Sequence, residues 1–154
     1  ERRDAQAVTG ILMPVFRAGE TYAIDRDIDE AEALAYWTGP ERRVFVAEEN
    51  GVILGTYYLV RNQKGGGSHV CNCGYVTAPQ ARGRGVARAM LAHSLEMGRR
   101  LKFLAMQYNF VVATNRRAIE TWRRAGFAVV GRTPDAFLHP EAGMVDALVM
   151  FRRL

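Results

Sequence analysis

The chain has 154 residues and a net charge of +5, with 49% hydrophobic and 24% charged residues. This length fits one domain over residues 1–154 with a sizeable core, and the composition disfavours a disordered protein. No apolar run is long enough to span a bilayer. We therefore expect neither a membrane partner nor a signal segment, and we take the cytoplasm as the default compartment.

The charge is unevenly distributed along the chain. Residues 1–81 hold eight basic and eleven acidic residues (net −3), whereas residues 82–154 hold thirteen and five (net +8). Such asymmetry is typical of a site for nucleic acid, an acidic partner or an anionic cofactor, and equally of a solvated basic face. The two cysteines, Cys71 and Cys73, cannot supply a disulfide framework or a complete zinc site, so we expect free thiols and no metal.

The first predicted elements are two helices. Apolar residues recur at helical spacing, interrupted by a glycine and a proline: Val8, Leu12, Val15 and Phe16, with Gly10 and Pro14. The second helix has Asp27 as N-cap and Glu30 as capping-box partner, and Gly39-Pro40 ends it. Because the chain opens on a helical pattern, we expect that a first strand is missing from it.

Strands and helices then alternate. Residues 43–48 and 52–60 are rich in β-forming residues and flank Asn50-Gly51, a pair that tolerates positive φ, which predicts a hairpin. A glycine-rich loop follows at 63–68. The remaining predicted elements are a strand at 70–77, a helix at 85–101, a strand at 103–112, a helix at 115–125, and strands at 128–130 and 145–151. This order predicts a mixed α+β domain built on one sheet.

The stretch from Tyr75 to Arg88 places a loop rich in glycine and arginine between a strand and the start of a long helix. Such a turn leaves backbone N–H groups unpaired, and the helix dipole adds positive charge, so the loop suits a phosphate or pyrophosphate. Gly83 and Gly85 let the backbone approach an anion closely. The loop matches neither GxxxxGK(S/T) nor GxGxxG, which argues against a P-loop or a Rossmann site.

At these residues the sequence resembles the GCN5-related N-acetyltransferase (GNAT) family. Its acyl-CoA signature, Q/R-x-x-G-x-G/A, is matched by Arg82-Gly-Arg-Gly-Val-Ala87, and its NxxAxxxYxxxGF helix resembles the segment from Asn115 to Phe127. The resemblance implies a central mixed, mostly antiparallel sheet, splayed between the family's fourth and fifth strands and flanked by about four helices. It also implies transfer of an acetyl group from acetyl-CoA to an amine.

The resemblance assigns cofactor roles to matching positions. The main chain of Tyr75, Val76 and Thr77 would pair with the pantetheine arm, and the Val76 amide would lie near the thioester carbonyl as an oxyanion donor. Asn115 would hydrogen-bond the pantetheine or the substrate side of the cleft, a role compatible with a plain helix N-cap. The pyrophosphate would be held, mostly through backbone N–H groups, by the loop and helix start, with a solvated helix surface as the alternative for Arg84 and Arg88. The residues are Arg82, Gly83, Arg84, Gly85, Val86, Ala87 and Arg88.

Two departures from the family pattern concern proton transfer. Trp122 stands where the family often has a tyrosine acid, and because an indole N–H does not release its proton, we expect Trp122 to pack against the cofactor or the core. Tyr108 is a candidate replacement, or else an ordinary strand aromatic. Neither central strand carries the glutamate that often serves as base. We therefore expect a water-relayed base that ends at Glu20 or Asp146.

Three short strings, around Asn72, Asn109 and Asp146, resemble fungal acetyltransferases that act on proline-like amino acids such as azetidine-2-carboxylate. The loop from Gly19 to Tyr22 is similar to the substrate loop of phosphinothricin-type acetyltransferases. These resemblances imply that Asn72, Asn109 and Tyr22 bind the acceptor; sheet amides satisfied by main chain are the alternative.

The leading hypothesis is an N-acetyltransferase for a small amine, an amino acid or an analogue, acting by direct attack in a ternary complex because no activated cysteine is evident. One alternative is acetylation of a protein N-terminus or lysine, and another is a non-catalytic acyl-CoA-binding module. Nucleic acid is not an expected partner, since the arginine pairs lie on separate helices without an aromatic platform. The family's common dimers suggest a homodimer.

Overall fold

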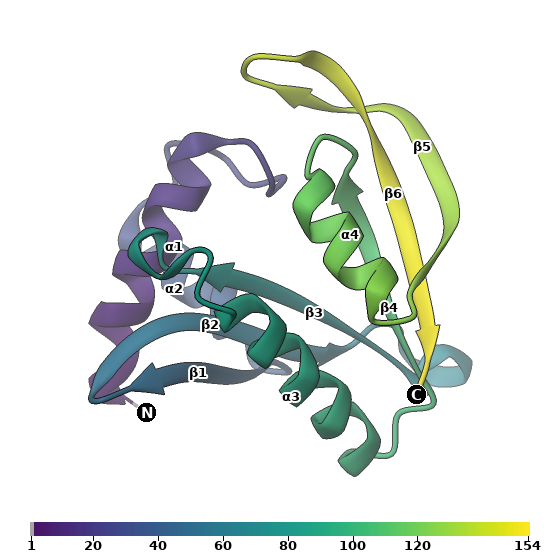
Figure 1. Ribbon diagram of the computed structural model, residues 1–154, viewed down its shortest axis with the longest axis horizontal. Coiled ribbons are helices and arrows are strands. Elements are labelled where there is room, and N and C mark those ends of the chain that lie inside the picture. Colours follow the sequence, from purple (N-terminus) through teal and green to yellow (C-terminus); the bar gives the residue numbers. More distant parts are fainter. Residues whose placement is uncertain (1) are drawn as a thin grey trace.

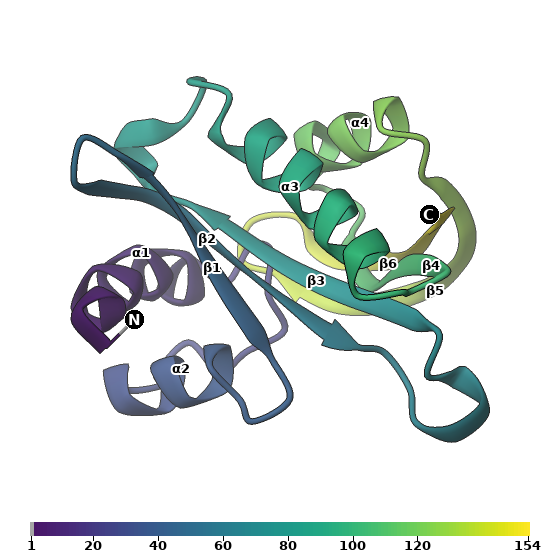
Figure 2. The same cartoon turned by 90° about the horizontal axis from the view of Figure 1, so that it is seen from below.

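A computed structural model describes residues 2–154, which form four α-helices around one six-stranded sheet (Figure 1). The strands are β1 (Arg43–Glu49), β2 (Val52–Arg61), β3 (Val70–Thr77), β4 (Ala105–Val112), β5 (Ala128–His139) and β6 (Gly143–Arg153). The helices are α1 (Ala5–Ala18), α2 (Glu30–Trp37), α3 (Val86–Arg100) and α4 (Arg116–Arg124). Figure 2 shows α1 and α2 on one face of the sheet and α3 and α4 on the other.

The sheet has the order β1-β2-β3-β4-β6-β5 and opens in its middle. All neighbouring strands are antiparallel except β3 and β4, which are parallel and pair at two positions, Val70 with Ala105 and Cys71 with Met106. Beyond Met106 the two strands diverge, and the gap between them widens toward their C-terminal ends (Figure 1). The predicted mixed, mostly antiparallel sheet with a splay between these two strands is confirmed.

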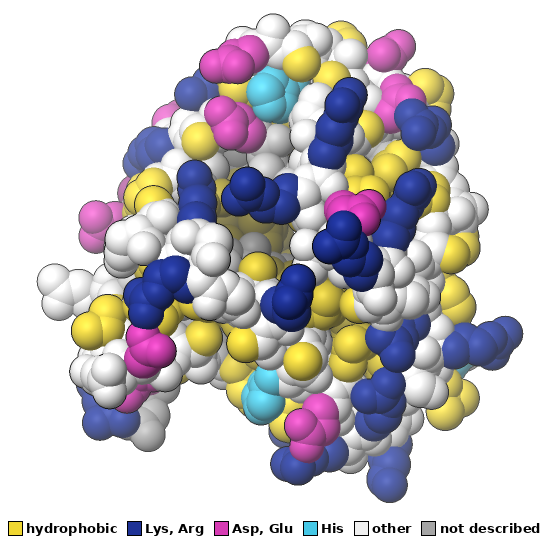
Figure 3. All heavy atoms as spheres, viewed as in Figure 1, with side chains coloured by type: hydrophobic (Ala, Val, Ile, Leu, Met, Phe, Trp, Pro, Cys, Tyr) yellow, Lys and Arg dark blue, Asp and Glu magenta, His cyan; other side chains and the backbone are white. Residues whose placement is uncertain are grey.

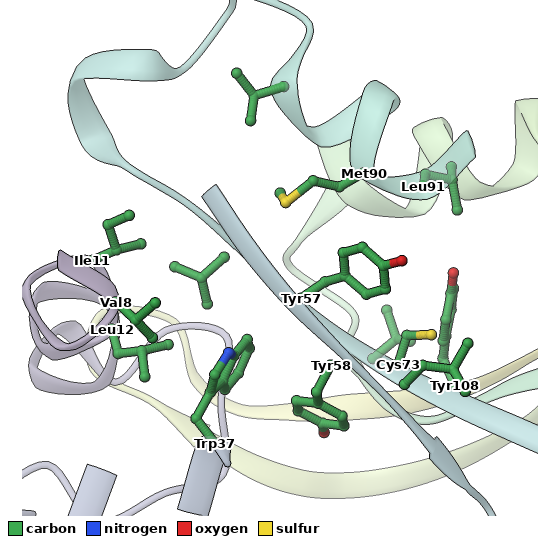
Figure 4. Close-up of a cluster of buried hydrophobic side chains, with 14 of the residues drawn as sticks. Val8, Ile11, Leu12, Trp37, Tyr57, Tyr58, Cys73, Met90, Leu91 and Tyr108 are labelled. Carbon is green, nitrogen blue, oxygen red and sulfur yellow. The ribbon is translucent and has the colours of Figure 1, made fainter. Parts of the chain in front are cut away.

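Alternation along the central strands divides the core between the two faces of the sheet. Tyr57 and Tyr58 point to opposite sides of β2 (Figure 4). Tyr58 packs edge-on against Trp37, with the two ring centroids 4.9 Å apart. Trp37 is fully buried and donates its indole N–H to the Thr56 hydroxyl at 3.0 Å. The α2 helix therefore packs firmly on β2, and β2 in turn pairs with β3, the strand that borders the gap.

The predicted start of α2 is corrected by two residues. Asp29, not Asp27, is the N-cap: its carboxylate accepts from the Glu32 N–H at 2.8 Å, and the Glu32 carboxylate accepts from the Asp29 N–H at 3.2 Å. The sequence holds two D-x-x-E frames, and the local pattern does not rank them. Ala33 and Trp37, four residues apart, lie together on the buried face of the helix.

The last two strands are longer than predicted. β5 continues from Ala128 to His139 and pairs with β6 as far as Gly143, and two register irregularities interrupt the pairing. Pro134 and Asp135 read locally as strand breakers, but they lie in the second irregularity, where Asp135 takes a φ of +48°.

None of the helices in the described chain is both long and apolar enough to cross a membrane. The missing first strand stays a prediction.

Candidate active site

The gap between β3 and β4 opens into a cleft of about 940 Å³. Its lining comes from α1 and the loop after it, from β3 and the loop that leads into α3, and from β4 and α4. Figure 3 shows a hollow on this face with Lys and Arg side chains around it. Residues distant in sequence thus meet at one site because the two central strands separate.

The start of α3 forms an anion cradle at one end of the cleft. Gly83 and Gly85 adopt φ values of +77° and +81°, in the left-handed region that favours glycine. A Cβ at either position would meet no atom within 4 Å, so the backbone here borders open space. The first N–H groups of a helix have no partner within the helix, and they carry its positive dipole end. The loop therefore fits a pyrophosphate, as expected from the sequence.

Arginines around the cradle divide into two groups. Arg82 and Arg88 line the cleft, as does Arg117 from α4. Arg84 is exposed, lies outside the lining and pairs with Glu49 at the end of β1. The expected pyrophosphate role of the Arg84 side chain therefore does not follow from this geometry, although its backbone belongs to the loop. Arg117 is not a specified position of the helix motif, and only the packing of α4 shows that it faces the cleft.

The hydrogen-bonding parity of β3 determines which of its amides reach the cleft. Asn62 N–H donates to Val70 O, and Ala78 N–H donates to Leu54 O, both at 2.8 Å. The register between these two bonds is unbroken. Because successive residues of a strand point their main-chain groups to alternate edges, even-numbered residues face β2 and odd-numbered residues face the gap.

This parity corrects the expected oxyanion donor. Val76 is even-numbered, lies opposite Thr56 and turns its N–H toward β2, so it cannot present that amide to the cleft. Tyr75 and Thr77 turn their N–H and C=O groups to the open edge, beyond the last pairing with β4 at Cys71. The N–H groups of Tyr75 and Thr77 and the Thr77 carbonyl are available to pair with an extended ligand in the manner of an added strand, whereas Tyr75 O already accepts from the Tyr22 hydroxyl.

The loop after α1 covers the other end of the cleft. Gly19 ends the helix at a φ of +65°, and the Arg26 side chain then donates to Arg17 O at 2.7 Å, which folds the loop back on the helix. A Cβ on Gly19 would lie 2.7 Å from the Arg26 side chain. This loop carries Tyr22, whose hydroxyl donates to Tyr75 O on β3 at 3.0 Å.

The two predicted acceptor amides differ in their surroundings. Asn72 and Asn109 both line the cleft. The Asn109 amide donates to Asn62 at 2.6 Å and its oxygen accepts from Gln107 at 3.1 Å, so both ends of this side chain already have partners. Asn72 has the same parity as Tyr58 and projects to the α1–α2 face with it. Asn72 is thus better placed than Asn109 to bind an acceptor.

The two candidate termini of a proton relay are separated by the fold. Glu20 is exposed and lines the cleft; of the described lining residues it alone carries a carboxylate. Asp146 lies outside the lining and pairs with Arg132 at 2.6 Å. Its pKa is lowered by the hydrogen bond from Arg132 and by the Asp135 N–H at 3.1 Å. Because Asp146 lies outside the cleft lining and its lowered pKa makes it a weaker base, it does not meet the requirements of the expected relay terminus.

Asn115 and Trp122 border the cleft from the α4 side. Asn115 occupies the N-cap position of α4 but makes no capping hydrogen bond with its side chain, and the residue lines the cleft. Trp122 also lines the cleft and packs on Tyr108 with ring centroids 4.7 Å apart. Trp122 thus packs against the core through Tyr108 and also borders the cleft, so it can contact a bound cofactor.

The two cysteines are free and buried. Burial raises the pKa of the Cys71 thiol to about 12, and burial, with a smaller effect of Cys71, raises the pKa of Cys73 further. Cys73 lines the cleft, yet at neutral pH it is a thiol and not the nucleophilic thiolate. Among residues 2–154 no three His, Cys, Asp or Glu side chains gather in a way that could hold a metal ion.

The cleft combines the open edge of β3 with the anion-binding start of α3, and both border the place where the sheet splits. This arrangement is typical of enzymes that bind acyl-CoA. The family model described as "Acetyltransferase (GNAT) family" matches residues 6–127. The chain belongs to the GNAT acetyltransferase family.

Individual relatives agree with this assignment. The structure of a GCN5-related N-acetyltransferase from Kribbella flavida is 38% identical, with a TM-score of 0.94, over 100% of this chain and 94% of that chain. The N-acetyltransferase aca1 of Schizosaccharomyces pombe is 35% identical over 98 residues, 63% of this chain and 47% of aca1, so the match spans about half of that relative. A phosphinothricin acetyltransferase from Sinorhizobium meliloti, solved with acetyl-CoA, shares the fold at 21% identity and a TM-score of 0.86, over 100% of this chain and 85% of that chain.

Proposed function

We propose that the chain is an N-acetyltransferase that moves an acetyl group from acetyl-CoA to the amine of a small molecule, an amino acid or a close analogue. The observation that carries the proposal is the continuity of one cleft. It runs from the anion cradle at Gly83 and Gly85, past the open edge of β3, to the loop around Glu20 and Tyr22. A cofactor end and an acceptor end thus meet at a single strand edge.

The cofactor end fits acetyl-CoA in three respects. The helix start and Arg82 and Arg88 would bind the pyrophosphate. The main chain of Thr77 would pair with the pantetheine, and the Tyr75 N–H would donate to the thioester carbonyl in place of the Val76 amide. When bound, acetyl-CoA supplies the thioester carbon that a neutral amine attacks.

The acceptor end favours a compact amine over an extended peptide. The hydrogen bond from the Tyr22 hydroxyl to Tyr75 O holds the Tyr22 ring at this end of the cleft, where it would limit the room for an extended chain. Asn72 and the Tyr22 ring would orient the amine, and Glu20 would receive its proton through water. An ammonium group has no lone pair, so this proton must leave before attack.

The test is a turnover assay with acetyl-CoA and two acceptor panels. The first panel holds proline-like and other small amino acids, including L-azetidine-2-carboxylate, and the second holds peptides with free N-termini or lysines. The proposal expects turnover of the first panel. Turnover of the peptides alone would contradict the acceptor assignment, and acetyl-CoA binding without turnover of either panel would indicate a binding module. The expected homodimer stays a prediction that sedimentation equilibrium tests.

Direct attack makes a further prediction about Cys73. Replacing Cys73 with alanine is expected to leave kcat within about threefold of the wild type, because a buried thiol of raised pKa carries no acetyl group. Cys71→Ala is the matched control, since Cys71 is buried beside it and does not line the cleft. Mass spectrometry after incubation with acetyl-CoA alone gives a second readout. A stable acetyl adduct on Cys73 would contradict direct attack.

A further inference from the structure

A chain of three hydroxyl groups lies at the base of the gap and links β4 to α3. The Tyr108 and Tyr75 hydroxyl oxygens are 2.9 Å apart, and Tyr75 Oη lies 2.7 Å from Ser94 Oγ. Ser94 Oγ in turn lies 2.8 Å from the carbonyl oxygen of Leu91, one turn earlier in α3. Tyr108 lines the cleft at one end of this chain, whereas Ser94 is fully buried at the other.

Counting hydrogens fixes the direction of the chain. It has three oxygen–oxygen contacts and three hydroxyl hydrogens, and the Leu91 carbonyl contributes none. Every contact contains a hydrogen in one arrangement alone: Ser94 donates to Leu91 O, Tyr75 donates to Ser94, and Tyr108 donates to Tyr75. Any other arrangement leaves two oxygens facing each other at hydrogen-bond distance with no hydrogen between them.

Neighbouring sulfur atoms do not change this count. Met106 Sδ lies 3.8 Å from the Tyr75 hydroxyl and is a weaker acceptor than Ser94 Oγ at 2.7 Å. The Cys73 thiol also faces Tyr75 and Ser94, but a thiol is a weak donor and occupies none of the three contacts.

The direction has a consequence for Tyr108. Its one hydroxyl hydrogen is used toward Tyr75, so its oxygen offers the cleft lone pairs and no proton. Tyr108 is 4% exposed, and burial raises its pKa well above the usual tyrosine value. The hydroxyl therefore stays protonated, with its proton directed away from the cleft. This arrangement does not suit the general acid for which Tyr108 was a candidate.

We infer that Ser94 is a positioning residue that orients the Tyr75–Tyr108 pair, so that Tyr108 accepts a hydrogen bond from a ligand in the cleft. The inference rests on the proposed function for the identity of that ligand. At the reacting atoms, two groups carry a suitable hydrogen: the N–H of the acceptor and the S–H of product CoA. The acetyl thioester has no S–H.

The variants Ser94→Ala and Tyr75→Phe test the inference from two sides. Without Ser94, Tyr75 loses the group that takes its hydrogen and becomes able to donate to Tyr108. Without the Tyr75 hydroxyl, Tyr108 loses its own acceptor. In both variants Tyr108 can turn its hydrogen toward the cleft, and binding of the donor ligand is expected to weaken about fivefold, the value of one ordinary hydrogen bond. Ser94→Thr, which keeps the hydroxyl, is expected to restore binding.

Calorimetry and kinetics distinguish the two ligand sources. If Tyr108 accepts from the thiol, the Kd of free CoA rises in Ser94→Ala and that of acetyl-CoA does not. If it accepts from the amine, the KM of L-azetidine-2-carboxylate, or of the panel amine with the highest turnover, rises and both cofactor Kd values stay unchanged. Either result supports the inference, and equal values for Ser94→Ala and wild type in all three measurements overturn it.

A double-mutant cycle separates orientation from a purely structural role of Ser94. In the Tyr108→Phe background, Ser94→Ala is expected to have no further effect on the affinity that it lowers in the wild type. An equal loss in both backgrounds would show that Ser94 acts through packing and would overturn the inference. Failure of wild type to bind acetyl-CoA would instead overturn the proposed function, together with the inference that rests on it.

Discussion

Replacing Gly83 with glutamate is expected to weaken acetyl-CoA binding by about 100-fold, because a carboxylate placed within a few ångström of a pyrophosphate in a partly enclosed site costs several kcal/mol. The left-handed φ of +77° adds backbone strain for any residue with a Cβ. Isothermal calorimetry with acetyl-CoA measures the loss, and thermal unfolding of the free protein reports the strain separately.

Gly143→Glu is the matched control. Gly143 has a φ of +72°, and a Cβ there would also meet no atom within 4 Å, so this variant introduces the same charge and a similar strain. It lies at the turn between β5 and β6, outside the cleft lining. We expect unchanged acetyl-CoA affinity. Equal affinities for Gly83→Glu and wild type would show that the loop is not the pyrophosphate site.

Replacing Glu20 with glutamine is expected to lower kcat/KM for the amine by about 100-fold, within the range typical of removing a general base. Glutamine keeps the size of the side chain and one acceptor oxygen but cannot take a proton. Because Glu20 lies at the acceptor end, the affinity for acetyl-CoA is expected to stay unchanged. Steady-state kinetics at low amine concentration and calorimetry with acetyl-CoA measure the two quantities.

Asp146→Asn provides the comparison, since the sequence predicts Asp146 as the other possible terminus of the proton relay. Its partner Arg132 is exposed, and surface ion pairs of this kind contribute little, so we expect kcat/KM within about twofold of the wild type. A large loss in Asp146→Asn with none in Glu20→Gln would reverse the assignment. Small losses in both would indicate that solvent alone takes the proton.

The elements that the sequence predicted well have strong local patterns. The Asn50-Gly51 hairpin, the glycine loop before α3 and the order of strands and helices follow from turn chemistry and from the period of apolar residues. The α1 helix also forms through Pro14, which lies on its exposed side. Where two local signals competed, as in the two D-x-x-E frames before α2, the sequence pattern did not rank them and the structure shows the second to form.

The pyrophosphate loop could be recognised from the sequence because its determinants are consecutive: two glycines at positive φ and the start of one helix act within a few residues. The sequence did not reveal which β3 amides can bind a ligand, because this depends on which edge of the strand each residue faces. A shift of one residue moves the N–H of Val76 from β2 to the gap, and pairing with β2 alone sets this parity.

The same distinction holds across the cleft. The sequence alone showed the resemblance to one family and the residue types at its site, because each motif consists of residues that are close together in the sequence. Contacts between distant segments decided which of these residues lie at the site. Glu20 lines the cleft, whereas Asp146 pairs with Arg132 and Arg84 pairs with Glu49 outside it. Ser94, on a buried helix face, came to orient Tyr108 across the gap. Such contacts form only in the folded chain, because they join segments that are far apart in the sequence.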